Sequence, residues 1–330
     1  MSTASLPHQD TIAEVLKSLE TETTALFDHL HLQFLFEFPV FAPDPRGRPR
    51  EFEPPELFRG LLHCFYNDIY EPKAMAQELA NDDIWPVCDF DRPPSRRTIS
   101  RFINDLSGVV EDVFSRILRQ VLVRVELGTC FRIDGTDVRA PRPDADASWN
   151  YDSTAEECYY GYGCCLVTTD NNIPLAATFT TGKSVDGKTA RRITQDALAV
   201  EKPITFVGDA EFDILDWHDD LIEAGVVPVA PYNPRNTNDP PDIEYRLQKR
   251  IKAHSDTVRV WEKQLDDTYD NRSQIETTIG VCKDHGLGTP KVRGRERAKT
   301  HVFVALCLRL AVVIANYERG GDIASPIVEL

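Results

Sequence analysis

The chain has 330 residues and a mass of 37.3 kDa, a length that suggests about two domains. Its 42% hydrophobic and 27% charged residues are typical of a globular protein and exclude collagen-like, disordered and membrane-embedded chains. The 37 basic and 53 acidic residues give a net charge of −16, which excludes binding of nucleic acid by bulk charge alone. Any contact with DNA must therefore be local.

Lysine is scarce, with 11 lysines against 26 arginines. An acidic, lysine-poor surface suits a cytosol at very high salt, where screening removes self-repulsion. We therefore expect a cytoplasmic halophile protein, with an ordinary acidic mesophilic protein as the alternative. The eight cysteines form no Cys-x2-Cys pair and the N-terminus does not resemble a signal peptide, which favours reduced thiols over structural zinc. A metal site at Cys158, Cys164 and Cys165 is the weaker alternative.

Apolar residues recur at helical spacing from Thr11 to about Glu126, which predicts an all-α N-terminal domain over residues 1–126. A proline-rich stretch at 41–55 interrupts it, and Ser95 is the expected N-cap of a later helix. Residues 92–102 hold four arginines and no acidic residue. Such a helix suits a helix-turn-helix-like reader of DNA, with a solvated basic face as the equally weighted alternative. The arginines we expect to contact DNA here are Arg96, Arg97 and Arg101.

The pattern changes to β-structure at Cys130. Strands are expected at 131–138, 159–168, 173–180, 204–207 and 226–230, with helices at 190–200 and 214–224. Further helix is expected from Glu244, and the apolar stretch 301–317 predicts a buried helix rather than a membrane span. Together these predict an α/β ribonuclease H-like domain over 127–320, with a mixed sheet flanked by helices, followed by a C-terminal tail over 321–330.

Two aspartates are candidate ligands for a metal ion. Asp134 is expected at the end of the first strand and Asp209 at the end of the fourth, 75 residues later. In a ribonuclease H-like sheet these two strands are neighbours, so the carboxylates converge where oxygen ligands can hold a hard divalent cation. Taken alone, each aspartate is more often a turn former or a helix cap.

A helical stripe supplies a third acid. Tyr269, Arg272, Glu276 and Lys283 follow the spacing Tyr-x2-Arg-x3-Glu-x6-Lys and fall within about 60° of one helix face. Glu276 can complete a carboxylate triad, while the other three side chains can hold a DNA backbone. The alternative is a solvated helix face with an Arg272–Glu276 ion pair.

A second basic stretch follows from 282 to 299, with six basic and two acidic residues. We expect DNA contacts here, with a plain surface loop as the alternative. The residues expected to make them are Lys291, Arg293 and Arg295. Trp149 and Trp217 could stack on a flipped base, although packing or surface placement is favoured for both.

Asp134, Asp209 and Glu276, with the spacing that begins at Tyr269, resemble the DDE transposases of insertion sequences that carry the YREK signature. The resemblance covers nearly the whole chain, and the tract 232–318 looks like the haloarchaeal members. It implies that the three acids bind two Mg²⁺ or Mn²⁺ ions and that the enzyme cleaves the ends of its element and joins them to target DNA. The 67 positions between Asp209 and Glu276 imply that the long β insertion of some relatives is absent.

The resemblance also implies the partners. These are the terminal inverted repeats and target DNA, bound by a homodimer on paired ends, with no membrane. Two positions depart from the family pattern, because Gly163 replaces a lysine and Phe212 replaces a tyrosine. Two other functions stay open: a catalytically inactive, DNA-binding descendant, and a metal-dependent nuclease without strand transfer.

Overall fold

The computed structural model describes residues 21–42, 50–152, 155–230, 269 and 272–330. The helix expected near Thr11 and the one expected from Glu244 begin outside these residues. Every regular element described before Cys130 is helical. These elements are α2 (Glu22–Phe27), η1 (Gln33–Glu37), α3 (Pro54–Tyr66), α4 (Pro72–Glu78), α5 (Arg96–Leu106) and α6 (Val110–Leu122).

Helix α5 begins where the sequence predicts. The hydroxyl of Ser95 accepts a hydrogen bond from the backbone N–H of Thr98 at 3.2 Å, which satisfies one of the free donors of the first turn. The helix is strongly amphipathic, because Ile99, Phe102 and Leu106 are buried while its arginines point outward.

A six-stranded mixed sheet follows, with strand order β2-β3-β1-β5-β6 and β4 paired to β3. Its strands are β1 (Cys130–Arg139), β2 (Ser148–Asp152), β3 (Glu157–Thr168), β4 (Pro174–Thr180), β5 (Thr205–Val207) and β6 (Val227–Val229). Strand β3 is antiparallel to β1, β2 and β4, while β5 is parallel to β1 and β6. The predicted α/β architecture is confirmed, with α7 (Gly187–Val200) and α8 (Leu215–Glu223) in the expected places.

Strand β2 was not predicted. Its residues alternate between polar and aromatic, but the segment is only five residues long and its aromatic residues, Trp149 and Tyr151, are exposed, so it does not stand out as a core strand; it pairs with β3.

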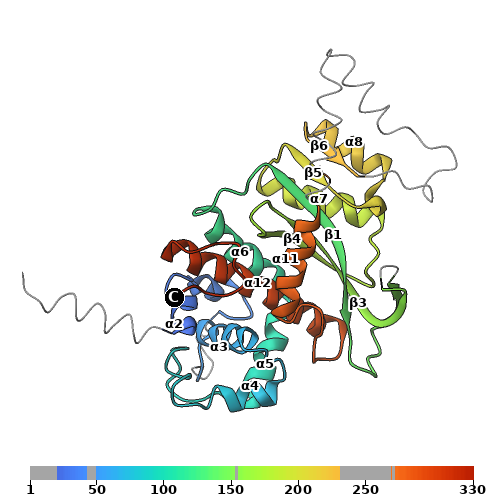
Figure 1. Ribbon diagram of the computed structural model, residues 1–330. Helices are drawn as coiled ribbons and strands as arrows, with labels where there is room; N and C mark the ends of the chain where they lie inside the picture. Colours follow the sequence, from blue (N-terminus) through green and yellow to red (C-terminus); the bar gives the residue numbers. More distant parts are fainter. Residues whose placement is uncertain (1–20, 43–49, 153–154, 231–268, 270–271) are drawn as a thin grey trace, which may run out of the picture.

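Helices α11 (Ser273–Asp284) and α12 (Arg295–Arg319) complete the fold. Figure 1 shows α12 between the N-terminal helices and the sheet, and it contacts α2, α3, α6 and β4. Among the described helices, α12 alone is long and apolar enough to cross a membrane, but 94% of its apolar window is buried inside the protein. The prediction of a buried core helix is confirmed, and one hydrophobic core joins the N-terminal helices to the sheet.

A buried arginine fastens the C-terminal residues to α12. Arg309 is fully buried and donates hydrogen bonds of 2.6 Å to the carbonyl oxygens of Ile323 and Ser325. Asn316, about two turns further on, donates to the carbonyl of Ile327 at 2.9 Å. Buried polar groups of this kind are stable only when they are hydrogen-bonded, so the C-terminal residues supply the acceptors that the polar side chains of α12 need.

Candidate active site

The register of the sheet aligns the two aspartates. Strand β1 pairs in parallel with β5, and Cys130 lies opposite Thr205, Phe131 opposite Phe206 and Arg132 opposite Val207. Each pair differs by 75 residues, which is also the separation of Asp134 and Asp209. Continued two residues past the end of β5, this register places Asp134 and Asp209 at the same level on adjacent chain segments.

The prediction that Asp134 closes its strand was wrong. Strand β1 continues to Arg139, because its other edge pairs with β3 as far as Arg139 opposite Gly161. Asp134 therefore lies in the middle of β1, at the point where the shorter neighbour β5 has already ended.

Local hydrogen bonds orient both carboxylates. Asp209 is the N-cap of the short helix η2 (Ala210–Phe212), and its Oδ1 accepts a hydrogen bond from the N–H of Glu211 at 2.9 Å. Oδ1 of Asp134 accepts from the N–H of Gly135 at 2.7 Å. Both aspartates are half-buried.

The two carboxylates repel each other. Burial, together with the charge of Asp209, raises the pKa of Asp134 to about 7, while the Gly135 N–H and the charges of Arg272 and Lys183 lower it. Two adjacent carboxylates are hard oxygen donors, and Arg272 and Lys183 offset their negative charge only in part, since the pKa of Asp134 stays raised. This donor set fits a divalent cation, which would relieve the repulsion.

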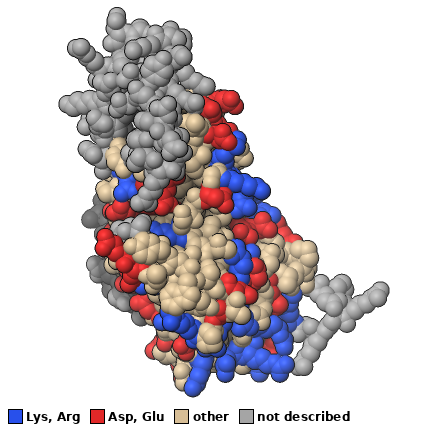
Figure 2. Space-filling view, turned by 90° about the vertical axis from the view of Figure 1, so that its right-hand side faces the viewer, with Lys and Arg blue, Asp and Glu red and all other residues tan. Residues whose placement is uncertain are grey.

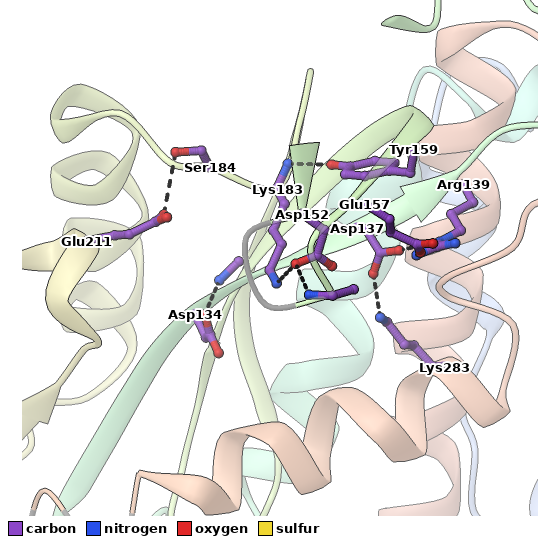
Figure 3. Close-up of polar contacts among 12 residues, drawn as sticks. Asp134, Asp137, Arg139, Asp152, Glu157, Tyr159, Lys183, Ser184, Glu211 and Lys283 are labelled. Carbon is purple, nitrogen blue, oxygen red and sulfur yellow. Dashed lines mark hydrogen bonds and ion pairs between the residues drawn. The ribbon is translucent and has the colours of Figure 1, made fainter. Parts of the chain in front are cut away.

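Lys183 lies near this pair and was missed by the sequence analysis. It belongs to the connection between β4 and α7, and its Nζ lies 2.9 Å from Oδ1 of Asp152 on β2 (Figure 3). Its backbone N–H donates to the hydroxyl of Tyr159 at 2.8 Å. Lys183 thus brings a positive charge to the aspartates from a segment without a recognisable motif.

Two glycines let this segment lie against the sheet. A Cβ at Gly135 would stand 2.2 Å from the carbonyl oxygen of Lys183, and one at Gly163 would stand 1.8 Å from that of Gly182. Glycine within a strand marks such close approach of another backbone. The absence of the family's lysine at position 163 therefore has a steric reason, since no side chain fits there.

The other departure is also a packing residue. Phe212 is buried, and its ring centre lies 6.0 Å from that of Trp217. Trp217 is itself fully buried and donates from Nε1 to the hydroxyl of Thr194 at 2.9 Å, so it packs and cannot stack on a base. Trp149 is 58% exposed, with the guanidinium of Arg142 at 4.1 Å from its ring centre.

Helix α11 presents the third acid. Its buried face contains Ile275, Thr278, Ile279 and Cys282. Glu276 lies on the opposite face, is 59% exposed and pairs with Nη2 of Arg272 at 3.1 Å. Among the residues that the structure describes, no three His, Cys, Asp or Glu side chains are grouped closely enough to hold a metal ion. The structure thus brings Asp134 and Asp209 together and leaves Glu276 on the neighbouring helix.

The remaining residues of the stripe lie along the same side of the sheet. Tyr269 packs against the small cluster of Cys130, Val207 and Val229, and the guanidinium of Arg272 lies 5.9 Å from its ring centre. At the other end of α11, Nζ of Lys283 lies 2.6 Å from Oδ1 of Asp137. The helix therefore runs along β1 from the start of the strand toward its end.

The two basic stretches meet in space. Arg96, Arg97 and Arg101 are exposed on α5, and Lys291 and Arg293 are exposed before α12. The stretches are joined where Nε of Arg297 donates to Oδ1 of Asn104 at 2.8 Å. Figure 2 shows Lys and Arg gathered at the lower end of one face.

Arg295 differs from its basic neighbours, because it is half-buried and makes structural contacts. Its backbone N–H donates to Asp146 at 3.0 Å, and its guanidinium lies 5.2 Å from the ring centre of Phe179. Of the three cysteines weighed as a metal site, Cys158 is exposed, while Cys164 and Cys165 are buried in β3.

Comparisons with known proteins agree with this arrangement. Residues 127–313 match the family described as Transposase DDE domain. The chain is 52% identical over 328 residues, 99% of each chain, to the "Probable transposase for insertion sequence element ISH11" of two strains of the halophilic archaeon Halobacterium salinarum.

Two solved structures are more distant. The chain is similar to the Drosophila P element transposase in its strand transfer complex (12% identity, TM-score 0.31, 92% of this chain and 65% of the other). It is also similar to the Mos1 transposase in its paired-end complex with the left transposon end (11% identity, TM-score 0.21, 86% and 89%). At such low TM-scores these add nothing to the assignment. The family match and the full-length relative show that the chain belongs to the DDE transposases.

Proposed function

We propose that this chain is the transposase of an insertion sequence, which cleaves the ends of its element and joins them to target DNA. The family and the full-length likeness to an insertion-sequence transposase support this function. The observation that carries it is the sheet register, which places Asp134 and Asp209 level with each other beside a helix that bears a third carboxylate.

Asp134, Asp209 and Glu276 are the residues that would hold two Mg²⁺ or Mn²⁺ ions. The chemistry such ions supply is activation of water or a 3′-hydroxyl and stabilisation of the leaving oxygen. The electrostatic repulsion within the aspartate pair supports this role, because the pair is costly without a cation. Glu276 is exposed and, within the described part of the chain, pairs with Arg272, so its carboxylate can turn toward the aspartates by a change of rotamer.

The positively charged side chains around the aspartates, Arg272 and Lys183, would hold the DNA backbone. The charges of Arg272 and Lys183 already act on Asp134, so a phosphate beside the carboxylates would meet both. Lys283 and the Tyr269 hydroxyl would contact the backbone on either side along α11.

End recognition would belong to a domain over residues 1–126. The exposed Arg96, Arg97 and Arg101 on α5 would contact the terminal inverted repeats, and the exposed Lys291 and Arg293 would contact DNA nearer the catalytic domain over 127–320. Arg295, which packs on Phe179, would support this segment rather than bind DNA itself. The C-terminal tail over 321–330 packs on α12. Because two ends must be joined to one target, the working form would be a homodimer on paired ends.

A cytoplasm at high salt is the expected setting. The acidic, lysine-poor composition and the Halobacterium relatives support it. We expect the protein to be more stable in molar KCl than in dilute buffer, measured as its melting temperature. Full stability in dilute buffer would contradict the halophilic interpretation.

A strand-transfer assay tests the function against its two alternatives. The protein is incubated with Mn²⁺, a supercoiled plasmid and labelled DNA that ends in the terminal repeat with a free 3′-hydroxyl. A transposase joins the label covalently to the plasmid. Cutting at the repeat boundary without joining would instead indicate a nuclease, and binding alone would indicate an inactive descendant.

A further inference from the structure

A chain of ion pairs crosses from β3 through β1 to α11, next to the aspartate pair but separate from it. Asp137 of β1 is at its centre, because its Oδ1 lies 2.6 Å from Nζ of Lys283 and its Oδ2 accepts from Nε of Arg139 at 2.7 Å. Arg139 also contacts Glu157 of β3. Figure 3 shows Asp137 between Arg139 and Lys283.

Asp137 is the fixed member of this chain. Its side chain is 9% exposed, against 38% for Lys283 and 44% for Arg139. Burial alone would raise the pKa of Asp137, but the hydrogen bonds from Lys283 and Arg139 outweigh it and leave this pKa below its ordinary value. The carboxylate is therefore an anion held in the sheet, and the flexible lysine reaches toward it.

The direction of α11 makes this contact informative. The start of the motif, Tyr269, packs on Cys130 at the beginning of β1, while Lys283 contacts Asp137 toward the end of β1. Helix and strand therefore run in the same direction, as Figure 1 also shows.

The spacings along the two elements then match. Asp137 follows Asp134 by three residues, about 10 Å along a strand, so their side chains leave β1 on opposite faces and only this spacing along the strand enters the comparison. Lys283 follows Glu276 by seven residues, about 10 Å and two turns along a helix, so both lie on one face. A contact between the later members of each pair sets the earlier members, Asp134 and Glu276, at the same level.

We propose that Asp137 is a positioning residue that, through Lys283, fixes the register of α11 along β1 and so holds Glu276 level with Asp134. The role rests on the proposed function, since the level of Glu276 matters only if it serves the aspartate site. In this role Lys283 positions α11 before any DNA is bound. None of the reacting atoms need touch Asp137.

The test compares wild type with Asp137→Asn, Lys283→Met and the double variant. The first readout is hydrogen exchange of the α11 amides in metal-free protein, and the second is the rate of Mn²⁺-dependent end cleavage. We expect faster exchange in α11 and cleavage slowed about 10- to 100-fold in each variant, because displacements near 1 Å cost about that much. We expect the double variant to be no slower than the slower single variant.

The affinity for end DNA separates positioning from simple phosphate binding. Asp137→Asn removes a negative charge and releases Lys283, so if the lysine served only to bind phosphate, this variant would bind and cleave DNA at least as well as wild type. That result would overturn the proposal. Additive slowing in the double variant would overturn it too.

A matched control removes another acid from an ion pair. Asp220 lies 2.6 Å from Arg191 and joins α7 to α8, away from α11, so Asp220→Asn should change neither α11 exchange nor cleavage. If Asp137→Asn does not fold, hydrogen exchange of α11 in the double variant decides the question, because loss of a lysine that only binds phosphate would leave this exchange unchanged. Failure of the proposed function would be visible separately, as absence of metal-dependent cleavage in wild type.

Discussion

The aspartate pair and the α11 face are held by different forces. Asp134 and Asp209 are placed by backbone hydrogen bonds of a parallel strand pair, and the residues beside them, Phe131 and Phe206, are fully buried. Glu276 and Lys283 lie on the exposed face of a helix, where Glu276 pairs with Arg272 and Lys283 pairs with Asp137. The aspartates are therefore fixed by backbone pairing, whereas the exposed Glu276 side chain can change its rotamer.

This difference suits a site that must admit DNA. Two ligands fixed in a sheet would define where a cation sits, while a third ligand on an exposed side chain would turn toward it once the substrate has entered. The exposed Arg272–Glu276 pair contributes only about 0–1 kcal/mol, so its rearrangement costs little, whereas the buried Asp137 carboxylate holds Lys283 in place.

The largest effect is expected at Glu276. Glu276→Gln should reduce cleavage on the order of 10³-fold while leaving folding and affinity for end DNA nearly unchanged, because the side chain is exposed and loses only its pair with Arg272. The measurement is single-turnover cleavage alongside a DNA-binding titration. Unchanged cleavage would remove Glu276 from the site.

A large loss of folding stability is expected at Gly163, where the sheet has no room for a side chain. Restoring the family's lysine by Gly163→Lys places a Cβ against the Gly182 carbonyl, which should lower the free energy of unfolding by about 3 kcal/mol or more. Denaturant titration measures this. Gly108→Ala is the control, because a Cβ there meets nothing within 4 Å, and an equal loss in both variants would contradict the steric account.

Acid should loosen the C-terminal end of α11. His301 of α12 is buried and its Nε2 donates to the carbonyl of Gly286 at 2.8 Å; burial lowers its pKa to about 4 from an ordinary 6.5. Below pH 6.5 the unfolded chain gains a proton that the folded protein does not take up until about pH 4. Stability should therefore fall across this window, by about 3 kcal/mol at most.

The variant His301→Gln isolates this contribution, since it keeps a donor but does not titrate. The difference in unfolding free energy between wild type and variant should change between pH 7 and pH 4 and stay constant above pH 7. A difference that is independent of pH would show that His301 does not cause the acid sensitivity.

The smallest effect, a gain in stability of α11, is expected at Gly280. Gly280 lies within α11 and a Cβ there meets nothing within 4 Å, so Gly280→Ala should stabilise the helix by about 0.5–1 kcal/mol. Thermal melting and exchange of the α11 amides measure this. Destabilisation would mean that α11 packs more tightly than its exposed face indicates.

Sequence patterns predicted the features that depend on neighbouring residues along the chain. The strands and helices predicted between Cys130 and Val229 and the cap at Ser95 were confirmed, with β2 as the one described strand that was not predicted, because periodicity and capping are properties of short segments. The burial of the apolar helix that contains Arg309 was confirmed for the same reason.

Sequence patterns did not predict the features that depend on which segments pair with each other in space. Strand β2 exists only because β3 offers an edge, and β1 outruns β5, so Asp134 is not at a strand end. Lys183 and Asp137 joined the site through contacts between segments 31 and 146 residues apart, a separation at which spacing carries no signal. The glycines at 135 and 163 were the one sequence clue that another backbone crosses the sheet there.

The most direct test of the account is cleavage of labelled DNA that carries the element's own terminal repeats, in molar KCl with Mg²⁺ or Mn²⁺, by wild type and Asp134→Asn. The account predicts metal-dependent nicking at the repeat boundary by wild type and its loss in the variant, with DNA binding retained by both. Nicking that persists in Asp134→Asn would contradict the assignment of the aspartate pair as the catalytic centre.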